Sequence, residues 1–285
     1  MPVIVDGGLS TALTELGCDL THPLWTARLL SENPAAIVAA HAAFLDAGAE
    51  VLITSSYQAS VDGFVRNGAT ADEARTLLQS TTRLARQAVG DRSAVVAASV
   101  GPYGAVLADG SEYRGDYALS NGELVMFHRD RVRLLAETEP DWWACETIPT
   151  AAEAVAMGLA LSTVRGRPTW MTFTCRSGSL TFGGDRIEDA VAAALSACDL
   201  SAVGVNCTAP GHVPELLERI GRVTDLPLVA YPNSGQSWDA DNKVWLGDSG
   251  AADVTAWVAA GAEYVGGCCG VGPTELAHLV TLARG

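Results

Sequence analysis

Short apolar runs alternate along the chain with longer stretches that are apolar on one side only. The runs have the length and composition of buried strands, whereas the longer stretches repeat their apolar residues at helical spacing. Several of the runs end in a turn that contains glycine or proline, as strands often do. The pattern predicts eight strands, over residues 3–8, 51–54, 94–100, 141–147, 169–175, 202–207, 226–231 and 263–267.

Each predicted strand is followed by a predicted helix. The first helix has clear boundary residues: Asn33 suits the N-cap, Pro34 suits the first helical position, and Gly48 suits the end. A longer polar loop, residues 108–120, precedes the third helix. The predicted helices cover residues 33–48, 71–89, 121–137, 151–164, 185–197, 213–220, 251–260 and 274–283.

Strands that alternate with helices predict a parallel sheet, and eight such units in 285 residues predict a closed α/β barrel, the (β/α)8 or TIM barrel. No composition break divides the chain, so we expect residues 1–285 to form a single domain. An open doubly wound sheet is the alternative, but no G-x-G-x-x-G follows the first strand. In a barrel the chemistry belongs at the C-terminal ends of the strands. The residues that fall at such ends are Asp6, Tyr57, Glu146, Cys207, Asn233, Cys268 and Cys269.

Composition narrows the classes of partner. The net charge is -15 and no basic cluster is present, which argues against nucleic acid and anionic membrane surfaces as partners. The longest apolar runs, such as residues 94–100, are too short to span a membrane, and residues 1–6 lack the features of a signal peptide. Seven cysteines in a chain of this size do not resemble a secreted disulfide framework. We therefore expect small-molecule substrates and a cytoplasmic location.

Two adjacent cysteines, Cys268 and Cys269, lie between glycines at the end of the last predicted strand. Neighbouring side chains on a regular strand point to opposite faces, so both sulfurs can serve one site only where glycine lets the backbone leave strand geometry. Cys207 ends another predicted strand. Three thiolates without an obvious fourth protein ligand suggest a zinc ion with one position open for substrate. The alternatives are buried apolar thiols or a strained disulfide between the adjacent pair.

The other cysteines favour a different role. Cys145 neighbours Glu146 on one strand, so if Glu146 faces the barrel centre, Cys145 faces the helices. Cys18 and Cys198 also favour the core, and Cys175 is ambiguous because it ends a strand.

A site with three cysteine ligands predicts a type of reaction. Zinc lowers the pKa of a bound thiol, so a substrate thiol binds as the thiolate at neutral pH. Three thiolates make the ion a weak Lewis acid, which suits a nucleophilic sulfur better than hydrolysis by an activated water. None of the five histidines pairs convincingly with a serine or cysteine, so we expect no protein nucleophile. The sequence therefore points to alkylation of a zinc-activated substrate thiolate.

Two carboxylates and several aromatic residues are candidates for binding the substrates. Asp6, before Gly7 and Gly8, either N-caps a following helix or holds a substrate ammonium, with the glycine amides near the substrate carboxylate. Glu146 follows an apolar run, and a carboxylate in such a place is seldom buried unless it is paired, so we expect it to hold a substrate amine.

Trp25, Tyr57 and Tyr231 could form an aromatic wall. Ordinary packing is the more common fate of such residues, but their faces would attract a cationic methyl donor.

These residues occur within segments that resemble one family over nearly the whole chain, the zinc-dependent homocysteine S-methyltransferases. The segments are Asp6-Gly7-Gly8, His22-Pro23-Leu24-Trp25, Ser56-Tyr57-Gln58-Ala59, Glu146-Thr147, Gly204-Val205-Asn206-Cys207, Tyr231-Pro232-Asn233-Ser234-Gly235 and Gly266-Gly267-Cys268-Cys269. The resemblance implies a (β/α)8 barrel in which Cys207, Cys268 and Cys269 bind Zn2+. It also implies methyl transfer to homocysteine, which gives methionine. The Ser-Tyr-Gln-Ala and Tyr-Pro-Asn-Ser-Gly segments look most like the branch that uses S-methylmethionine, with S-adenosylmethionine as a second donor.

We assign the matching residues to two groups. Homocysteine would contact Asp6, Gly7, Gly8, Glu146 and Asn206, and the methyl donor would lie beside Trp25, Tyr57, Gln58, Tyr231 and Asn233. One departure is that Gly270 stands where family members often carry an arginine. A betaine-type donor and a non-catalytic zinc- or thiol-binding protein are the alternatives.

Overall fold

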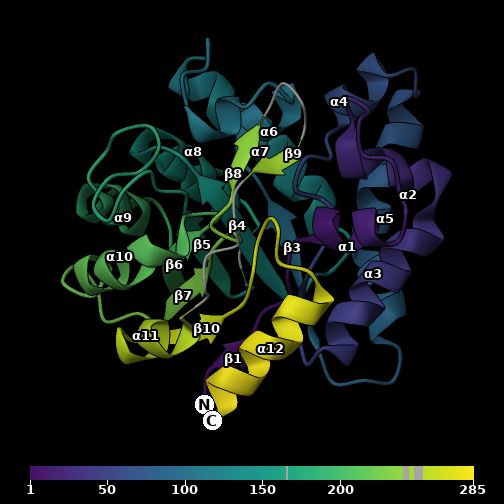
Figure 1. The fold of residues 1–285 in the computed structure, drawn as a ribbon. Helices are drawn as coiled ribbons and strands as arrows, with labels where there is room; N and C mark the ends of the chain where they lie inside the picture. Colours follow the sequence, from purple (N-terminus) through teal and green to yellow (C-terminus); the bar gives the residue numbers. More distant parts are fainter. Residues whose placement is uncertain (165, 240–243, 247–252) are drawn as a thin grey trace.

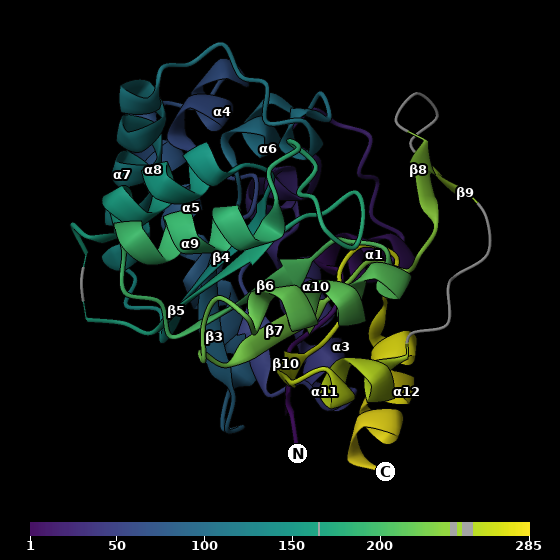
Figure 2. The same ribbon diagram turned by 90° about the vertical axis from the view of Figure 1, so that its left-hand side faces the viewer.

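The protein is an eight-stranded parallel barrel surrounded by helices (Figures 1 and 2). The structure, a computed structural model, describes residues 1–164, 166–239, 244–246 and 253–285. The strands lie in the order β1-β10-β7-β6-β5-β4-β3-β2. A parallel bridge between Val5 and Val51 joins the two ends of this order, and the Glu50 amide donates to the Ile4 carbonyl at 2.8 Å. The sheet is therefore closed, which confirms the predicted TIM barrel and rules out the open doubly wound sheet.

All eight predicted strands are present, with small differences at their ends. β1 and β10 stop before the glycines that were included in the predicted ranges, because Gly8 instead donates to the Val271 carbonyl and Gly267 to the Asp6 carbonyl. The barrel strands are β1 (Val3–Ile4), β2 (Val51–Ile53), β3 (Val95–Val100), β4 (Trp142–Ile148), β5 (Thr169–Phe173), β6 (Ala202–Asn206), β7 (Leu228–Tyr231) and β10 (Ala262–Val265).

Each of the eight predicted helices is also present. The side chain of Asn33 accepts a hydrogen bond from the Ala36 amide, as expected of an N-cap. Of the predicted helix 251–260, the first two residues lie outside the described part of the chain, and the helix begins at Val254. The helices are α3 (Pro34–Asp46), α5 (Ala71–Val89), α7 (Asn121–Ala136), α8 (Ala151–Leu161), α9 (Ile187–Ala197), α10 (Val213–Ile220), α11 (Val254–Ala259) and α12 (Pro273–Arg284).

Several short elements in the loops were not predicted, because they are too short to show a period of apolar residues. β8 and β9 pair in antiparallel fashion after β7 and project from the barrel body in Figure 2. The short elements are α1 (Leu9–Glu15), η1 (Trp25–Arg28), α2 (Leu29–Glu32), α4 (Val61–Arg66), α6 (Tyr103–Leu107), η2 (Ser111–Tyr113), η3 (Pro210–His212), β8 (Ser237–Asp239) and β9 (Val244–Leu246).

The core has two layers. Trp142 of β4 and Tyr264 of β10 are in ring contact at 5.9 Å, although their strands are not neighbours in the sheet, so this contact crosses the barrel interior. The larger layer lies between the barrel and the helices, and it includes Cys145. The interpretation of Cys145 as a core thiol that faces the helices is therefore confirmed. Cys175 joins the same layer.

The two termini lie side by side below the N-terminal ends of the strands, where α12 passes β1 (Figure 1). Among the described residues, no helix combines the length and the apolar character needed to cross a membrane.

Candidate functional site

Three sulfur atoms meet at the C-terminal ends of β6 and β10. The Sγ atoms of Cys207, Cys268 and Cys269 lie within 4.8 Å of one another. Cys207 has a φ of 45°, an unusual left-handed conformation for a residue with a side chain. All seven cysteines are free thiols, so Cys268 and Cys269 do not form a disulfide with each other. The fold thus brings together the three cysteines that the sequence singled out.

Close backbone contacts explain the glycines around the cysteine pair. The Cys268 amide donates to the Pro232 carbonyl at 2.8 Å, which holds the segment after β10 against the segment after β7. A Cβ on Gly266 would lie 2.6 Å from the Val5 carbonyl oxygen. Gly270 has a φ of 77°, and a Cβ there would lie 2.3 Å from Ser234 Oγ. Residue 270, where the resemblance would suggest an arginine, therefore has a backbone conformation that favours glycine.

Of the three thiols, Cys207 is the one whose thiolate form is favoured. Hydrogen bonds from Cys268 and then Cys269 hold the pKa of Cys207 well below its usual range. The hydrogen bond to Cys207 raises the pKa of both Cys268 and Cys269. The Tyr113 hydroxyl lies 3.3 Å from Cys207 Sγ and adds to the stabilisation of that thiolate. A cation at the cluster would favour the thiolate form of all three.

Asn206, the residue before Cys207, organises the ends of three strands. Its Oδ1 accepts hydrogen bonds from the Thr147 amide at 2.6 Å and from Thr172 Oγ1 at 2.8 Å. Its Nδ2 donates to Thr147 Oγ1 at 2.8 Å and lies 3.9 Å from Cys268 Sγ. Asn206 is fully buried, so in this structure its side chain supports the site from below.

Glu146 is buried at the end of β4. Ser99 Oγ donates a short hydrogen bond to Glu146 Oε1. Burial raises the pKa of the Glu146 carboxyl to about 7, in spite of the hydrogen bonds from Ser99 and Tyr231 and with a further contribution from Cys207. The carboxyl group of Glu146 thus lies within electrostatic reach of the sulfur cluster.

Asp6 lies in the same electrostatic environment. It is buried, and its Oδ2 accepts a hydrogen bond from the Ile53 amide at 2.8 Å. Burial raises the pKa of its carboxyl well above the usual range, and the charge of Glu146 raises it further. Helix α1 has Gly8 as its N-cap with no side-chain cap, so the alternative in which Asp6 caps that helix is wrong. The Gly8 amide donates to the Val271 carbonyl, and a Cβ on Gly7 would lie 2.5 Å from the same oxygen.

The residues assigned to the methyl donor lie in different surroundings. Tyr231 is buried in the barrel, where its hydroxyl contacts Thr172 at 2.8 Å and Trp170 at 3.2 Å. Tyr57 lies near the cluster, since Thr147 is its hydrogen-bond partner and Cys207 acts on its pKa. The ring contacts among the described residues do not join Tyr231 to Tyr57 or Trp25, and an aromatic wall beside the donor stays a prediction.

The other residues of this group hold loops. Gln58 Nε2 donates to the Pro23 carbonyl at 3.0 Å, which ties the segment before Trp25 to the end of β2. Trp25 has a φ of 46° and is partly exposed. Asn233 Oδ1 accepts a hydrogen bond from the Gly235 amide at 2.9 Å, a local turn that follows β7. Their contacts with a donor stay a prediction.

Sequence reasoning missed Tyr113 and Arg131. Tyr113 comes from the long polar loop between β3 and α7, where only an aromatic residue among polar neighbours could have pointed to it. Arg131 is buried on α7 and donates to the carbonyls of Ser56, Tyr57 and, at 3.0 Å, Gly101. For Arg131, the available signal in the sequence was a charged residue on the side of a predicted helix that faces the barrel.

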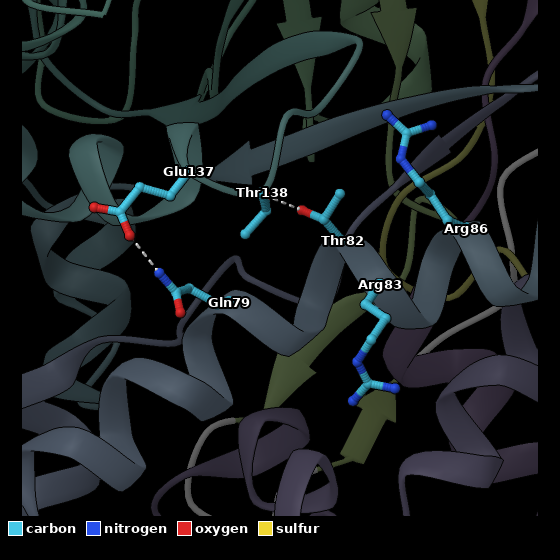
Figure 3. Close-up of a pocket in the computed structure, with 6 residues that line it drawn as sticks. All are labelled: Gln79, Thr82, Arg83, Arg86, Glu137 and Thr138. Atoms are coloured by element: carbon cyan, nitrogen blue, oxygen red, sulfur yellow. Dashed lines mark hydrogen bonds between the residues drawn. The ribbon is translucent and has the colours of Figure 1, made fainter.

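A hollow of about 430 Å³ on the outer layer is separate from this site (Figure 3). Gln79 donates to Glu137 at 2.7 Å and Thr138 to Thr82 at 2.7 Å, and these contacts bridge α5 to the end of α7. The residues after α7 lead into the start of β4, so this hollow lies toward the N-terminal ends of the strands, away from the cysteines.

The arrangement can hold a thiophilic metal ion. Three thiols converge, one of them already favours the thiolate, and two buried carboxyl groups lie nearby. Such a donor set fits Zn2+ or a similarly soft ion better than Mg2+ or Ca2+.

Comparison with known proteins gives a consistent result. A sequence model of the family described as homocysteine S-methyltransferase matches residues 3–283. The chain is 36% identical over 297 residues to the homocysteine S-methyltransferase YbgG of Bacillus subtilis, covering 99% of this chain and 94% of the relative. It is 39% identical over 290 residues to the homocysteine S-methyltransferase of Escherichia coli, covering 97% of this chain and 94% of the relative.

A solved structure is similar throughout. The metallated form of the homocysteine methyltransferase MmuM from Escherichia coli has a TM-score of 0.87 and 38% sequence identity, covering 100% of this chain and 96% of that chain. The apo form of MmuM has a TM-score of 0.77 and 31% identity, covering 99% of this chain and 95% of that chain. The fold is thus shared with a protein that was crystallised in a metallated form.

Proposed function

We propose that this chain, which belongs to the homocysteine S-methyltransferase family, transfers a methyl group to the sulfur of homocysteine and so forms methionine. The observation that carries the proposal is the convergence of three cysteine sulfurs within 4.8 Å at the C-terminal end of the barrel. The family match covers residues 3–283, which supports the view that residues 1–285 act as one homocysteine-binding domain.

Cys207, Cys268 and Cys269 would hold Zn2+. Their number and chemistry support zinc, since structural and catalytic zinc sites use thiolate ligands and a catalytic site keeps a position for substrate. An ion held by these cysteines would lower the pKa of the homocysteine thiol and so favour the thiolate at neutral pH. Tyr113 stabilises the Cys207 thiolate through its hydroxyl, and Asn206 orients the strand end that carries Cys207.

The buried carboxylates would hold the substrate ammonium group. Asp6 and Glu146 each have a raised pKa because they are buried, and the charge of Glu146 raises the pKa of Asp6 further, so a cation bound beside them would offset these costs. The homocysteine sulfur then attacks the methyl carbon of the donor. A new sulfur–carbon bond forms, the donor's carbon–sulfur bond breaks, and its electron pair returns to the donor sulfur, which becomes a neutral thioether.

For the donor we propose a sulfonium compound, S-methylmethionine with S-adenosylmethionine as a second choice. This reaction needs no protein nucleophile, and holding the two reacting atoms near attack distance supplies much of the rate. The charge of -15 is compatible with a cationic donor. The seven free cysteines support a reducing, cytoplasmic environment.

The test is a donor panel with purified, zinc-loaded protein. Methionine formed from homocysteine is measured with S-methylmethionine, S-adenosylmethionine and betaine in separate reactions. We expect the highest rate with S-methylmethionine. If methionine forms with betaine but with neither sulfonium, the donor is betaine. The proposal of methyl transfer to homocysteine would still hold.

Two single cysteine variants, one inside the cluster and one outside it, test the role of the metal. Cys207→Ala should lose bound zinc and methyl transfer together, whereas Cys18→Ala, at a partly buried position outside the cluster, should keep both. Bound zinc without methionine from any donor would instead favour a non-catalytic metal- or thiol-binding protein. Full activity of the metal-free Cys207→Ala variant would end the proposal.

A further inference from the structure

The loop between β3 and α7 carries an acidic side chain, Glu112, near the sulfur cluster. The proposed reaction gives this side chain no role. Glu112 belongs to η2 (Ser111–Tyr113), and its neighbour Tyr113 has its hydroxyl 3.3 Å from Cys207 Sγ. The loop is packed closely against α6, because a Cβ on Gly104 would lie 2.3 Å from the Glu112 backbone nitrogen. The backbone of Glu112 is therefore fixed beside the site.

One oxygen of the Glu112 carboxylate lacks a partner. Its Oε2 atom is buried and forms no hydrogen bond with the described residues. Burial raises the pKa of the Glu112 carboxyl to about 7, against a hydrogen bond from its own backbone amide that lowers it, and the charges of Cys207 and Asp109 raise it further. Arg114 acts in the opposite direction, but its side chain is 53% exposed and pairs with Asp109 and Asp116. A buried carboxylate oxygen without a partner is unfavourable until a donor or a cation reaches it.

Glu112 differs in this respect from the other two acids of the site. Asp6 accepts a hydrogen bond from the Ile53 amide, and Glu146 accepts one from Ser99. Asp6 follows β1 and Glu146 lies on β4, whereas Glu112 comes from the β3–α7 loop. Both Glu112 and Glu146 act on the pKa of Tyr57, and the charge of Cys207 acts on both carboxyl groups. The site therefore has a further acidic side chain near Tyr57 that a loop, and not a barrel strand, contributes.

We propose that Glu112 is the counter-charge for the cationic group of the methyl donor and so determines the preference for a sulfonium over a neutral compound. The inference rests on the proposed methyl transfer from a sulfonium. A sulfonium carries a positive charge that it cannot lose as a proton, so a site that removes it from water is stabilised by a negative charge at a fixed place. Glu112 supplies this charge from a partly buried side chain whose Oε2 atom is enclosed, near Tyr57, whose aromatic face also attracts cations.

The test compares a cation with its neutral isostere. S-methylmethionine and 2-amino-5-methylhexanoic acid differ mainly by the exchange of S+ for CH, and each is titrated calorimetrically into the zinc-loaded protein. We expect the wild type to bind the sulfonium more tightly, and Glu112→Gln to reduce this preference by about tenfold or more, as expected for a lost charge-assisted contact. Affinity for the neutral isostere should stay within about twofold, and Glu112→Asp should retain part of the preference.

Kinetics and a control separate this role from a structural one. In the methyl-transfer assay, Glu112→Gln should raise KM for S-methylmethionine and leave KM for homocysteine nearly unchanged. Asp116→Asn changes the net charge equally in the same loop, but at a side chain that is 67% exposed, so it should not alter the preference. Zinc content and the melting temperature of Glu112→Gln should match the wild type, since Oε2 has no partner to lose.

The outcomes distinguish this inference from the proposed function. Preferential binding of S-methylmethionine by the wild type that Glu112→Gln abolishes, without any turnover, would support the role of Glu112 and contradict the proposed reaction. Equal affinity of the wild type for both ligands, no affinity for either, or an unchanged preference in a folded Glu112→Gln variant would overturn the inference.

Discussion

Asn206 and Thr147 exchange two hydrogen bonds across the ends of β6 and β4. The Thr147 amide donates to Asn206 Oδ1 at 2.6 Å, and Asn206 Nδ2 donates to Thr147 Oγ1 at 2.8 Å. Thr147 has a φ of 61°, which is rare for a β-branched residue and needs support from its surroundings. Because Glu146 precedes Thr147 and Cys207 follows Asn206, this pair fixes the carboxylate relative to the cysteine cluster.

Asn206→Ala should therefore destabilise the protein and weaken the site together. The substitution leaves the buried Thr147 amide without its acceptor and removes support for a strained backbone, so we expect a loss of about 2–4 kcal/mol in the free energy of unfolding. Urea denaturation of the zinc-free protein measures it. Asn121→Ala, at an exposed position at the start of α7, is the control and should change stability by less than about 0.5 kcal/mol. Equal stability of the two variants would show that the Asn206 contacts are dispensable.

Gly270→Ala tests whether glycine is required after the cysteine pair. The φ of 77° disfavours any side chain, and a Cβ would lie 2.3 Å from Ser234 Oγ. Gly68 has a φ of 97° with open space around its position, so Gly68→Ala measures the backbone cost alone. We expect about 1 kcal/mol for Gly68→Ala and clearly more for Gly270→Ala, together with weaker metal binding. Comparable losses for both in thermal unfolding would mean that Ser234 moves aside at little cost.

Much of the fold and the position of the cysteine cluster could be predicted from the sequence. The barrel was predictable because each strand is an apolar run of typical length and each long helix has regular apolar spacing. The convergence of Cys207 with the Cys268–Cys269 pair followed from the same prediction, because parallel strands end at one face. Glycines beside the cysteines indicated that the backbone leaves the strand there, and β10 ends at Val265, so that both sulfurs of the pair reach one cluster.

The supporting contacts were not predictable in the same way. The role of Asn206 depends on a strained Thr147 in another strand, and no local pattern encodes that pairing. Tyr113 and Glu112 lie in an irregular loop, where apolar periodicity gives no position for a side chain. The contacts of Tyr231 were not predictable either: its side chain points into the barrel interior, where its hydroxyl contacts Thr172 and Trp170.

Tyr113→Phe should weaken metal binding without unfolding the protein. The hydroxyl lies 3.3 Å from Cys207 Sγ and stabilises its thiolate, and partners of this kind typically contribute about 10–100-fold in metal affinity. Competition with a chromophoric chelator measures the affinity for zinc. Tyr264→Phe is the control, because the Tyr264 ring contacts Trp142 at the start of β4, whereas Cys207 follows the end of β6. Unchanged affinity in Tyr113→Phe would assign the hydroxyl no role at the metal.

His41 makes stability depend on pH at a place far from the chemistry. It is fully buried in α3, and neither ring nitrogen has a hydrogen-bond partner among the described residues. Burial lowers the pKa of His41 from 6.5 to about 4. Above pH 6.5 the ring is neutral in both the folded and the unfolded state and contributes no pH dependence. Below pH 6.5, His41 binds a proton in the unfolded chain but stays neutral in the folded protein. The free energy of unfolding therefore falls as the pH drops toward 4.

His41→Phe should remove this contribution. Over the full interval the difference between the two pKa values corresponds to about 3 kcal/mol, of which about 2 kcal/mol is already lost at pH 5. Carboxylates add their own pH dependence, but they do so equally in both proteins, so the quantity to measure is the difference in unfolding free energy between variant and wild type from pH 7.5 to 4.5. That difference should shift in favour of His41→Phe as the pH falls. His278→Gln, at an exposed position in α12, should give a constant difference. A constant difference for His41→Phe as well would show that the folded protein admits the proton at His41, contrary to its burial.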